Sequence, residues 1–449
     1  MVGRYQPYLG YKDSGVEWLG ELPEHWEVKR LGHFFEERRE KVSDKDYPAL
    51  SVTMQGVVPQ LEHAAKTDTG DNRKLVLKND FVINSRSDRK GSSGVSPLDG
   101  SVSLISIVMT PRKINPKFAH HLLRSYPFQE EFYRYGKGIV ADLWSTNSSE
   151  MKSILMPDIP EGEQEKIANF LDYETAKIDT LIEKQQQLIK LLKEKRQAVI
   201  SHAVTKGLNP NAPMRDSGVE WLGEVPEHWK ITRLKYQVDM LPGYAFKSAG
   251  FVDSAEEINL LRGINIAPGK IRWDETVFWP SQNNDDLEEY ILEEKDLVLG
   301  MDRPWVGGGL RLAMLSSADL PAYVVQRVAR IRGKNGISQE YVFNILSDSS
   351  FLSYFEPITT GVSVPHISTD QIGEYYFALP AESERREIAE YIRSTTSKYK
   401  TLVKSADEAI KFMQERRTAL ISAAVTGKID VRNWQAPKTQ NINNKEVTV

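Results

Sequence analysis

The chain contains the same sequence block twice. DSGVEWLGELPEHW occupies Asp13–Trp26 and DSGVEWLGEVPEHW occupies Asp216–Trp229, so the copies differ only where Leu22 stands opposite Val225. A second pair of similar segments follows, KEKRQAVISHAVTKG (193–207) and QERRTALISAAVTGK (414–428). The separation between copies is far longer than the roughly 20–50 residues of a solenoid repeat, so it predicts a duplicated domain. Two similar frames enclose two unlike inserts, an arrangement that suits the reading of a split, asymmetric target.

Composition excludes several classes of protein. The 449 residues are enough for two or more domains with proper cores. The absence of cysteine excludes disulfides, thiolate metal sites and a cysteine nucleophile. The sequence has no apolar run long enough to span a membrane and its first residues lack a secretory h-region, so we expect a cytoplasmic protein with no membrane partner. A net charge of −4 means that any nucleic-acid contact must come from local basic patches.

Two long helices are predicted in the frames. Residues 163–204 contain no glycine or proline, and prolines (Pro160, Pro380) precede each helical stretch while glycines (Gly207, Gly427) follow it. With a few polar members allowed, apolar residues recur at alternating steps of four and three, which predicts a coiled-coil seam; its members are Ile167, Leu171, Ile178, Leu181, Leu188, Leu192 and Val199, then Ile388, Ile392, Tyr399, Leu402, Ala409, Met413 and Leu420.

A two-fold relation between the frames would set the helices antiparallel. The alternative is one more helical hairpin inside a core. Apolar residues beside the seam, namely Ile182, Ile189, Val403 and Phe412, are candidates for binding a partner. The sequence also predicts that the chain closes on itself. The first helix leads directly into the second DSGVEWLGE block, but no such block follows the second helix, so residues 11–30 are expected to pack beside that helix's end.

The inserts, about 35–157 and 236–377, show mixed α and β patterns. Each has a strand-like run, DFVIN (80–84) or DLVLG (296–300), followed by a loop with glycine and arginine. Arginine suits phosphate and guanine edges, and glycine allows close backbone approach to phosphate. The candidate DNA-binding residues are Arg86, Arg89, Lys90, Ser92 and Ser93 in the first loop, Arg303, Trp305 and Arg311 in the second, and Lys247 in GYAFKSAGF. The alternatives are solvated surface hairpins and, for GYAFKSAGF, an aromatic core segment with a capping serine.

With these blocks in view, the chain resembles the specificity (S) subunits of type I restriction–modification systems, the HsdS family, over almost its whole length. The segments that carry the resemblance are DSGVEWLGELPEHW and its copy, IPEGEQEKIANFL, INSRSDRKGSSGV, GYAFKSAGF, GMDRP and VQRVARI. The second helix start, LPAESERREIAEYI, departs from the first, because it has one extra residue before Ile388 and carries Arg385 where Gln164 stands.

The resemblance implies an α+β fold with two mixed α/β target recognition domains in a pseudo-two-fold arrangement, joined by two long antiparallel coiled-coil helices. The expected segments are an N-terminal part with the first recognition domain (1–158), a spacer helix (159–210), the second recognition domain (211–378), a second spacer helix (379–431) and a polar, disordered tail (432–449). Each recognition domain would read one half of a bipartite asymmetric DNA site, while the helices set the spacing and dock the modification subunits.

The implied partners are double-stranded DNA, two methyltransferase (modification) subunits that use S-adenosylmethionine to methylate adenine N6, and two restriction subunits that use ATP and Mg²⁺. The chain itself would be non-catalytic, with no cofactor or metal. Its sequence agrees, because it has no GxxxxGK[ST] loop and no HExxH, and the nearest string to a methyltransferase (N/D)PP(F/Y/W) loop is NPKF (115–118), which we interpret as a turn before a helix. The alternatives are a protein-only coiled-coil scaffold and a self-sufficient DNA methyltransferase or nuclease.

Overall fold

The computed structural model describes residues 5–62, 70–138, 144–254, 256–281, 286–307, 309–359 and 364–437. The chain divides into two compact units. Unit 1 comprises Met1–Gln186 and Asp407–Val449, and unit 2 comprises Gln187–Ala406. Each long helix is therefore shared between the units, whereas the sequence predicted the helices as segments of their own.

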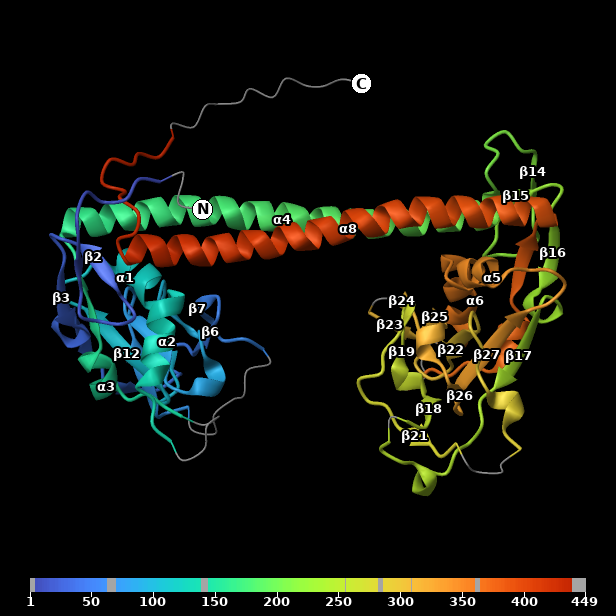
Figure 1. Cartoon of the computed structure of the whole chain (residues 1–449), viewed down its shortest axis with the longest axis horizontal. Coiled ribbons are helices and arrows are strands. Elements are labelled where there is room, and N and C mark those ends of the chain that lie inside the picture. Colours follow the sequence, from blue (N-terminus) through green and yellow to red (C-terminus); the bar gives the residue numbers. More distant parts are fainter. Residues whose placement is uncertain are drawn as a thin grey trace. The chain divides into compact units, whose positions relative to one another are not determined.

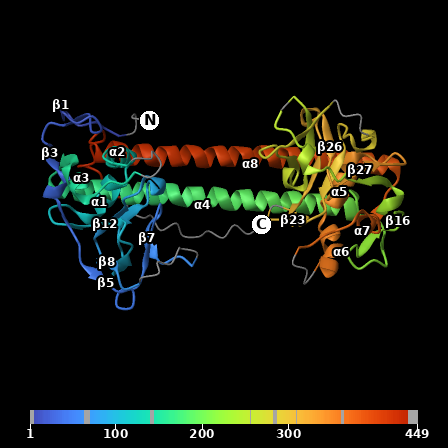
Figure 2. The ribbon, with the colours of Figure 1, turned by 90° about the horizontal axis from the view of Figure 1, so that it is seen from below.

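Unit 1 holds the first insert between short frame strands. Its elements are β1 (Tyr11–Asp13), β2 (Glu21–Pro23), β3 (Glu27–Arg30), β4 (Phe35–Glu37), β5 (Lys41–Val42), β6 (Leu50–Thr53), β7 (Gly56–Pro59), β8 (Arg73–Val76), β9 (Phe81–Asn84), β10 (Ser93–Val95), β11 (Gly100–Val102), β12 (Ser106–Pro111), α1 (Pro116–Leu123), α2 (Tyr126–Arg134), α3 (Ser148–Ser153) and β13 (Leu155–Asp158). In two views of this unit α1 lies close to the long helices (Figures 1 and 2).

Unit 2 repeats this plan with the second insert. Its elements are β14 (Met214–Asp216), β15 (Glu224–Pro226), β16 (Lys230–Arg233), β17 (Val238–Pro242), β18 (Ile258–Leu261), β19 (Ile266–Ala267), β20 (Lys270–Ile271), β21 (Phe278–Trp279), β22 (Leu297–Gly300), β23 (Trp305–Val306), β24 (Gly309–Leu310), β25 (Leu312–Met314), β26 (Ala322–Val324), β27 (Val328–Gly333), α5 (Gln339–Leu346), α6 (Ser349–Thr359), α7 (Thr369–Gly373) and β28 (Tyr376–Leu379).

The two inserts share one sheet and differ in another. The four-stranded sheet has the order β10-β9-β12-β4 in unit 1 and, read in the same sense, β25-β22-β27-β17 in unit 2. Beside it, β8 pairs antiparallel with β11 in unit 1, whereas β18 pairs parallel with β26 in unit 2. The duplicated fold thus carries the same central sheet and two differently built neighbouring sheets.

The two long helices are α4 (Glu161–Lys206) and α8 (Glu382–Val425), each followed by a glycine with positive φ, Gly207 or Gly427. Within unit 1 they run antiparallel, because Phe170 near the start of α4 contacts Trp434 beyond α8, while Asp179 further along α4 pairs with Arg417 before the end of α8. The predicted helices are confirmed, and each appears as one continuous ribbon in Figure 1.

The predicted seam is confirmed at seven positions that are buried, namely Ile167, Leu171, Ile178, Leu192, Ile388, Ile392 and Leu420. It differs at three others. Leu181, Leu188 and Leu402 were assigned to it, but 45%, 43% and 51% of their surfaces are exposed. Their neighbours take the inner positions instead, with Ile189 buried and Ile182 half-buried against the core of unit 1. Two adjacent apolar residues on a helix point about 100° apart, and the sequence offered no polar neighbour to decide between them.

The frame of unit 1 is closed by the chain segment after α8, as predicted. The Tyr11 hydroxyl donates to the carbonyl oxygen of Gly427 at 3.0 Å, and the Lys428 ammonium donates to that of Glu21 at 2.7 Å. The expectation of a disordered tail from residue 432 is wrong for its first residues, because Arg432 pairs with Asp430 and Trp434 packs on Phe170. Residues 438–449 lie outside the described part of the chain.

A glutamate at the start of each long helix anchors the repeated block. In unit 1 the buried Glu163 carboxylate accepts hydrogen bonds from the Trp26 indole at 3.2 Å and from the Tyr8 hydroxyl, and it contacts His25 Nε2 at 2.9 Å. In unit 2 the equivalent Glu384 contacts His228 Nε2 at 2.9 Å. The two histidines therefore have a structural role in the repeated block.

The departure at the second helix start leaves the local turn unchanged. In unit 1 the Gln164 amide donates to the Ile159 carbonyl oxygen at 2.7 Å. In unit 2 the Arg385 guanidinium donates to the Pro380 carbonyl oxygen at 3.0 Å, in the same place. Both side chains are buried and fix the residues that precede the helix.

Candidate nucleic-acid interface

The first candidate loop lies between β9 and β10 of unit 1. A short 3₁₀ turn, Ser87–Arg89, projects it from the sheet edge. The backbone of Ser87 donates to the Trp144 carbonyl oxygen at 2.9 Å, and Thr146 N donates to that of Ser85 at 3.0 Å, so a second segment supports the loop. The loop therefore projects from the sheet and is held in place by backbone hydrogen bonds, and such a loop can position side chains on a ligand.

The three cations of this loop reach solvent. Arg86 and Arg89 are exposed, and the Arg89 guanidinium lies 3.7 Å from Asp88. Lys90 differs, because its ammonium is 2.5 Å from the Glu130 carboxylate and 5.9 Å from the centre of the Tyr133 ring. Among the described residues Arg86 has no side-chain partner and Arg89 has only the adjacent Asp88, while Lys90 would have to exchange its partner Glu130 to meet DNA.

The expectation that Ser92 and Ser93 contact DNA is wrong. Ser93 is completely buried within β10, opposite Ile83, and Ser92 is 7% exposed. At the adjacent Gly94 the β7 backbone comes close, because an added Cβ would lie 3.1 Å from the Gly56 Cα. The SSG string is therefore a packing feature of the sheet.

The second candidate loop follows β22 of unit 2. Arg303 is exposed with a positive φ of 43°, and its amide donates to the Pro365 carbonyl oxygen at 2.7 Å. The neighbouring Asp302 is held by His366 at 2.6 Å and Arg327 at 2.7 Å, and these two partners lower the pKa of its carboxyl group against the opposing effect of burial. Arg303 is thus displayed on a loop that ion pairs hold in place.

The other two candidates in this loop support the fold. Arg311 donates to the carbonyl oxygens of Ile266 at 3.1 Å and of Gly263, so its guanidinium is committed to the backbone of its own unit. Burial lowers its pKa. The half-buried Trp305 packs its ring against Phe351 and Phe355, with centroids 6.1 and 5.9 Å away. Both side chains therefore have a structural role, and both remain half-buried, so their contact with DNA stays a prediction.

Two arginines that the sequence did not single out line an open hollow of about 700 Å³ in unit 2, together with Arg311, Gln326 and the exposed Ile264. They are Arg262 and Arg327, and Arg327 has a positive φ of 66° in the turn before β27. The predicted Lys247 is exposed at the start of a 3₁₀ turn, and the hollow is lined by Phe246 and Ser248 on either side of it. The sequence signal that could have identified Arg327 is its position within the otherwise apolar run YVVQRVARI.

The candidates for partner binding divide into two groups. Ile189 is buried and Ile182 and Val403 are half-buried, so these three side chains expose less surface to a partner than the sequence predicted. Phe412 on α8 is 64% exposed and can still contact a partner. Leu181, Leu188 and Leu402 are also exposed, whereas the sequence had predicted their neighbours for this role.

Among the described residues, no group of three metal-binding side chains comes together, and no helix is both long and apolar enough to cross a bilayer. The NPKF string is a helix cap, as predicted, because the Asn115 side chain accepts from the amides of Lys117 and Phe118.

Comparisons with known proteins agree with this architecture. No family model matches the chain. It is 26% identical to the type I restriction enzyme MjaVIII specificity subunit of Methanocaldococcus jannaschii, over 94% of this chain and 98% of that protein. It is 32% identical to the EcoAI specificity subunit of Escherichia coli over 54% of this chain and 41% of that one.

A solved structure shows the same fold. A chain from a structure of the type I restriction–modification system superposes with a TM-score of 0.67 at 15% identity, over 91% of this chain and 99% of that one. The resemblance inferred from the repeated blocks is confirmed: the chain is homologous to type I restriction enzyme specificity subunits over nearly its whole length.

Proposed function

We propose that this protein is the DNA specificity subunit of a type I restriction–modification complex. Each insert reads one half of a bipartite, asymmetric DNA site, and the two long helices set the distance between the halves. The chain does no chemistry of its own. It directs a methyltransferase and an ATP-dependent endonuclease, and S-adenosylmethionine, ATP and Mg²⁺ are bound by those subunits.

The observation that carries the proposal is homology to specificity subunits along 94% of the chain. The construction of the inserts supports it. Their central sheets have the same strand order, but the adjacent sheets and the projecting loops differ, with Arg89 displayed in one unit and Arg303 in the other. A scaffold that binds only protein gives no reason for two unlike surfaces on one repeated core.

The exposed apolar residues on the long helices support a protein partner. Phe412, Leu181, Leu188 and Leu402 remain outside the seam with exposed apolar side chains, and burial of these side chains by a partner would be favourable. We propose that two modification subunits dock on these helices and that two restriction subunits join the assembly.

Deletion of the gene is expected to remove N6-methyladenine from one split, asymmetric motif in the host DNA. Single-molecule long-read sequencing with and without the gene measures this directly and also gives the target sequence. Restoring the gene on a plasmid is the control. Unchanged methylation beside intact modification genes would contradict the proposal and favour a protein-only scaffold.

Replacing Arg89 or Arg303 by alanine should affect the two half-sites separately. A good arginine contact with a base discriminates by about 1–3 kcal/mol, so Arg89→Ala is expected to relax one half-site and Arg303→Ala the other. Methylation of a plasmid library with randomised half-sites measures this. The exposed arginines Arg39 and Arg386 lie outside both loops, and their alanine variants serve as controls. Equal weakening of both half-sites would mean that these arginines only anchor phosphate.

A further inference from the structure

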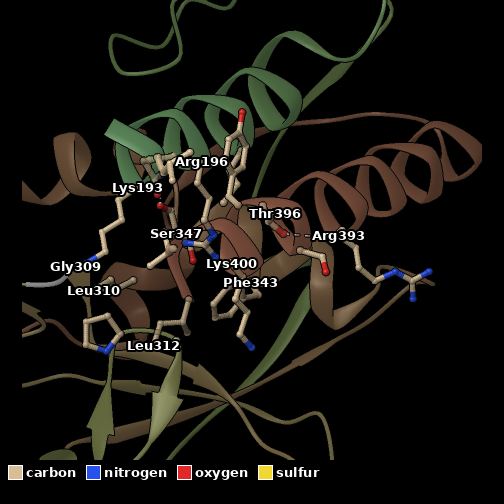
Figure 3. Close-up of a pocket in the computed structure, with 18 residues that line it drawn as sticks. Lys193, Arg196, Gly309, Leu310, Leu312, Phe343, Ser347, Arg393, Thr396 and Lys400 are labelled. Carbon is tan, nitrogen blue, oxygen red and sulfur yellow. Dashed lines mark hydrogen bonds between the residues drawn. The ribbon is translucent and has the colours of Figure 1, made fainter. Parts of the chain in front are cut away.

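A basic hollow of about 630 Å³ lies in unit 2 between the long helices and the second insert (Figure 3). Its cations are Lys193 and Arg196 from α4 and Arg393 and Lys400 from α8, and the described residues that line it include no aspartate or glutamate. The Arg393 side chain extends away from the hollow and pairs with Glu390, so Lys193, Arg196 and Lys400 are the charges that define it.

The equivalent place in unit 1 is neutralised. There Arg417, which the repeat aligns with Arg196, forms an ion pair with Asp179 at 2.9 Å. Aligning Glu163 with Glu384 places Asp179 opposite Lys400 and Asp172 opposite Arg393. These two acids on α4 in unit 1 therefore correspond to bases on α8 in unit 2, which inverts the charge on one side of the site while its arginine is kept.

The inversion leaves Arg196 without a counter-charge. In the described part of unit 2 no side chain or carbonyl oxygen pairs with its guanidinium, and burial lowers its pKa. Asp172 in unit 1 is, by contrast, held by His121 at 2.8 Å and Lys117 at 3.3 Å. Arg196 is exposed, so its guanidinium can be reached from solvent, and the side chains of Lys193 and Lys400 line the same hollow. An anion from outside the chain would supply the counter-charge that the chain does not.

We propose that this hollow is a binding site for a phosphate group, carried either by free phosphate or by the backbone of DNA. Three cations facing one hollow without an acid match a dianionic group with several acceptor oxygens better than a single carboxylate. Arg196 provides a planar fork of donors, and Lys193 and Lys400 provide point charges from the two helices. Unit 1, with Asp179 in place, has no such site among its described residues.

The test is Lys400→Asp in the full chain, because it installs the acid that unit 1 already has and supplies Arg196 with an internal partner. Lys398→Asp makes the same charge change on the same helix outside the hollow. Calorimetric titration with inorganic phosphate is expected to show binding to the wild type and to Lys398→Asp, and at least about tenfold weaker binding to Lys400→Asp. Arg196→Gln is the second variant and should lose binding as well.

Duplex DNA distinguishes the two sources. If the phosphate belongs to DNA, the slope of log affinity against log salt should fall by about 0.9 for each phosphate that Lys400→Asp no longer neutralises, and remain unchanged in Lys398→Asp. This arm rests on the proposed function, whose failure would appear as a wild-type complex that does not bind DNA, while the phosphate titration still decides the site. The proposal is overturned if Lys400→Asp and Lys398→Asp match in phosphate affinity and, where DNA binds, in salt slope.

Discussion

Glu163→Ala is expected to lower the free energy of unfolding of unit 1 by about 3–5 kcal/mol. The substitution removes the common acceptor of the Trp26 indole and the Tyr8 hydroxyl, and both donors are buried. An unsatisfied buried donor costs about 1–3 kcal/mol, so two of them together account for most of the effect. Guanidinium denaturation, followed by hydrogen exchange of the peptide containing Trp26, measures the loss.

The repeat provides the matched control. Glu384→Ala removes the same side chain from unit 2, but its partner His228 is half-exposed and water can replace the contact. The Trp229 indole nitrogen already has no hydrogen-bond partner among the described residues, so the substitution orphans no second group. We expect a loss of about 1 kcal/mol or less. Equal losses for the two variants would show that the hydrogen bonds of Glu163 contribute little.

Gly427→Ala should destabilise unit 1 by about 3 kcal/mol for two separate reasons. The residue has a φ of 71°, a conformation that costs an L-residue about 1–2 kcal/mol. A Cβ there would also lie 2.7 Å from Pro23 Cγ and 3.0 Å from the Trp26 ring, in the place where the segment after α8 meets the repeated block. Thermal unfolding monitored by tryptophan fluorescence is the measurement.

Gly15→Ala separates these two reasons. Gly15 has a nearly equal φ of 67°, but an added Cβ would meet nothing within 4 Å. Its substitution should therefore show the backbone effect alone, about 1 kcal/mol. If Gly15→Ala and Gly427→Ala were equally destabilising, the close packing against Pro23 and Trp26 would be relieved at no cost, and the junction would be softer than its geometry indicates.

The frame could be predicted from the sequence because the repeat supplies an internal comparison. The block missing after the second helix indicated that Tyr11 and its neighbours would complete that frame, and the hydrogen bond from Tyr11 to Gly427 confirms it. The ends of both helices were equally predictable, since Gly207 and Gly427 have the positive φ that stops a helix.

At Leu181 and Leu188 the seam register was not predictable in the same way. Leu181 and Ile182 are adjacent and both apolar, as are Leu188 and Ile189, so the alternation of four and three fits either choice. The decision comes from what the helices pack against. Ile182 reaches the core of unit 1, which is assembled from residues distant in the sequence.

Which of the candidate residues can reach DNA depends on their burial, and composition does not predict the burial of a loop residue. Arg89 and Arg311 both stand in loops with glycine, yet one is exposed and the other donates to backbone carbonyl oxygens of its own unit. From the sequence, Ser92 and Ser93 were predicted to be exposed hydrogen-bond donors, but Ser93 lies in β10, which pairs with β9. Nothing in the sequence alone singled out Arg196. Its lack of a counter-charge becomes apparent only when the two units are compared, because Lys400 in unit 2 occupies the position of Asp179 in unit 1.

The closure of unit 1 has a consequence for the order in which the chain can fold during synthesis. Unit 2 is one continuous stretch, 187–406, whereas unit 1 needs residues 407–434 to cover Trp26 and to pair with Tyr11 and Asp179. Contacts between such distant residues form late, because a long loop must first close. Residues 1–186 of unit 1 are translated first, but the unit is completed only when residues 407–434 have been made. Until then Trp26 and the apolar seam of α4 are uncovered, and the incomplete unit is prone to aggregation.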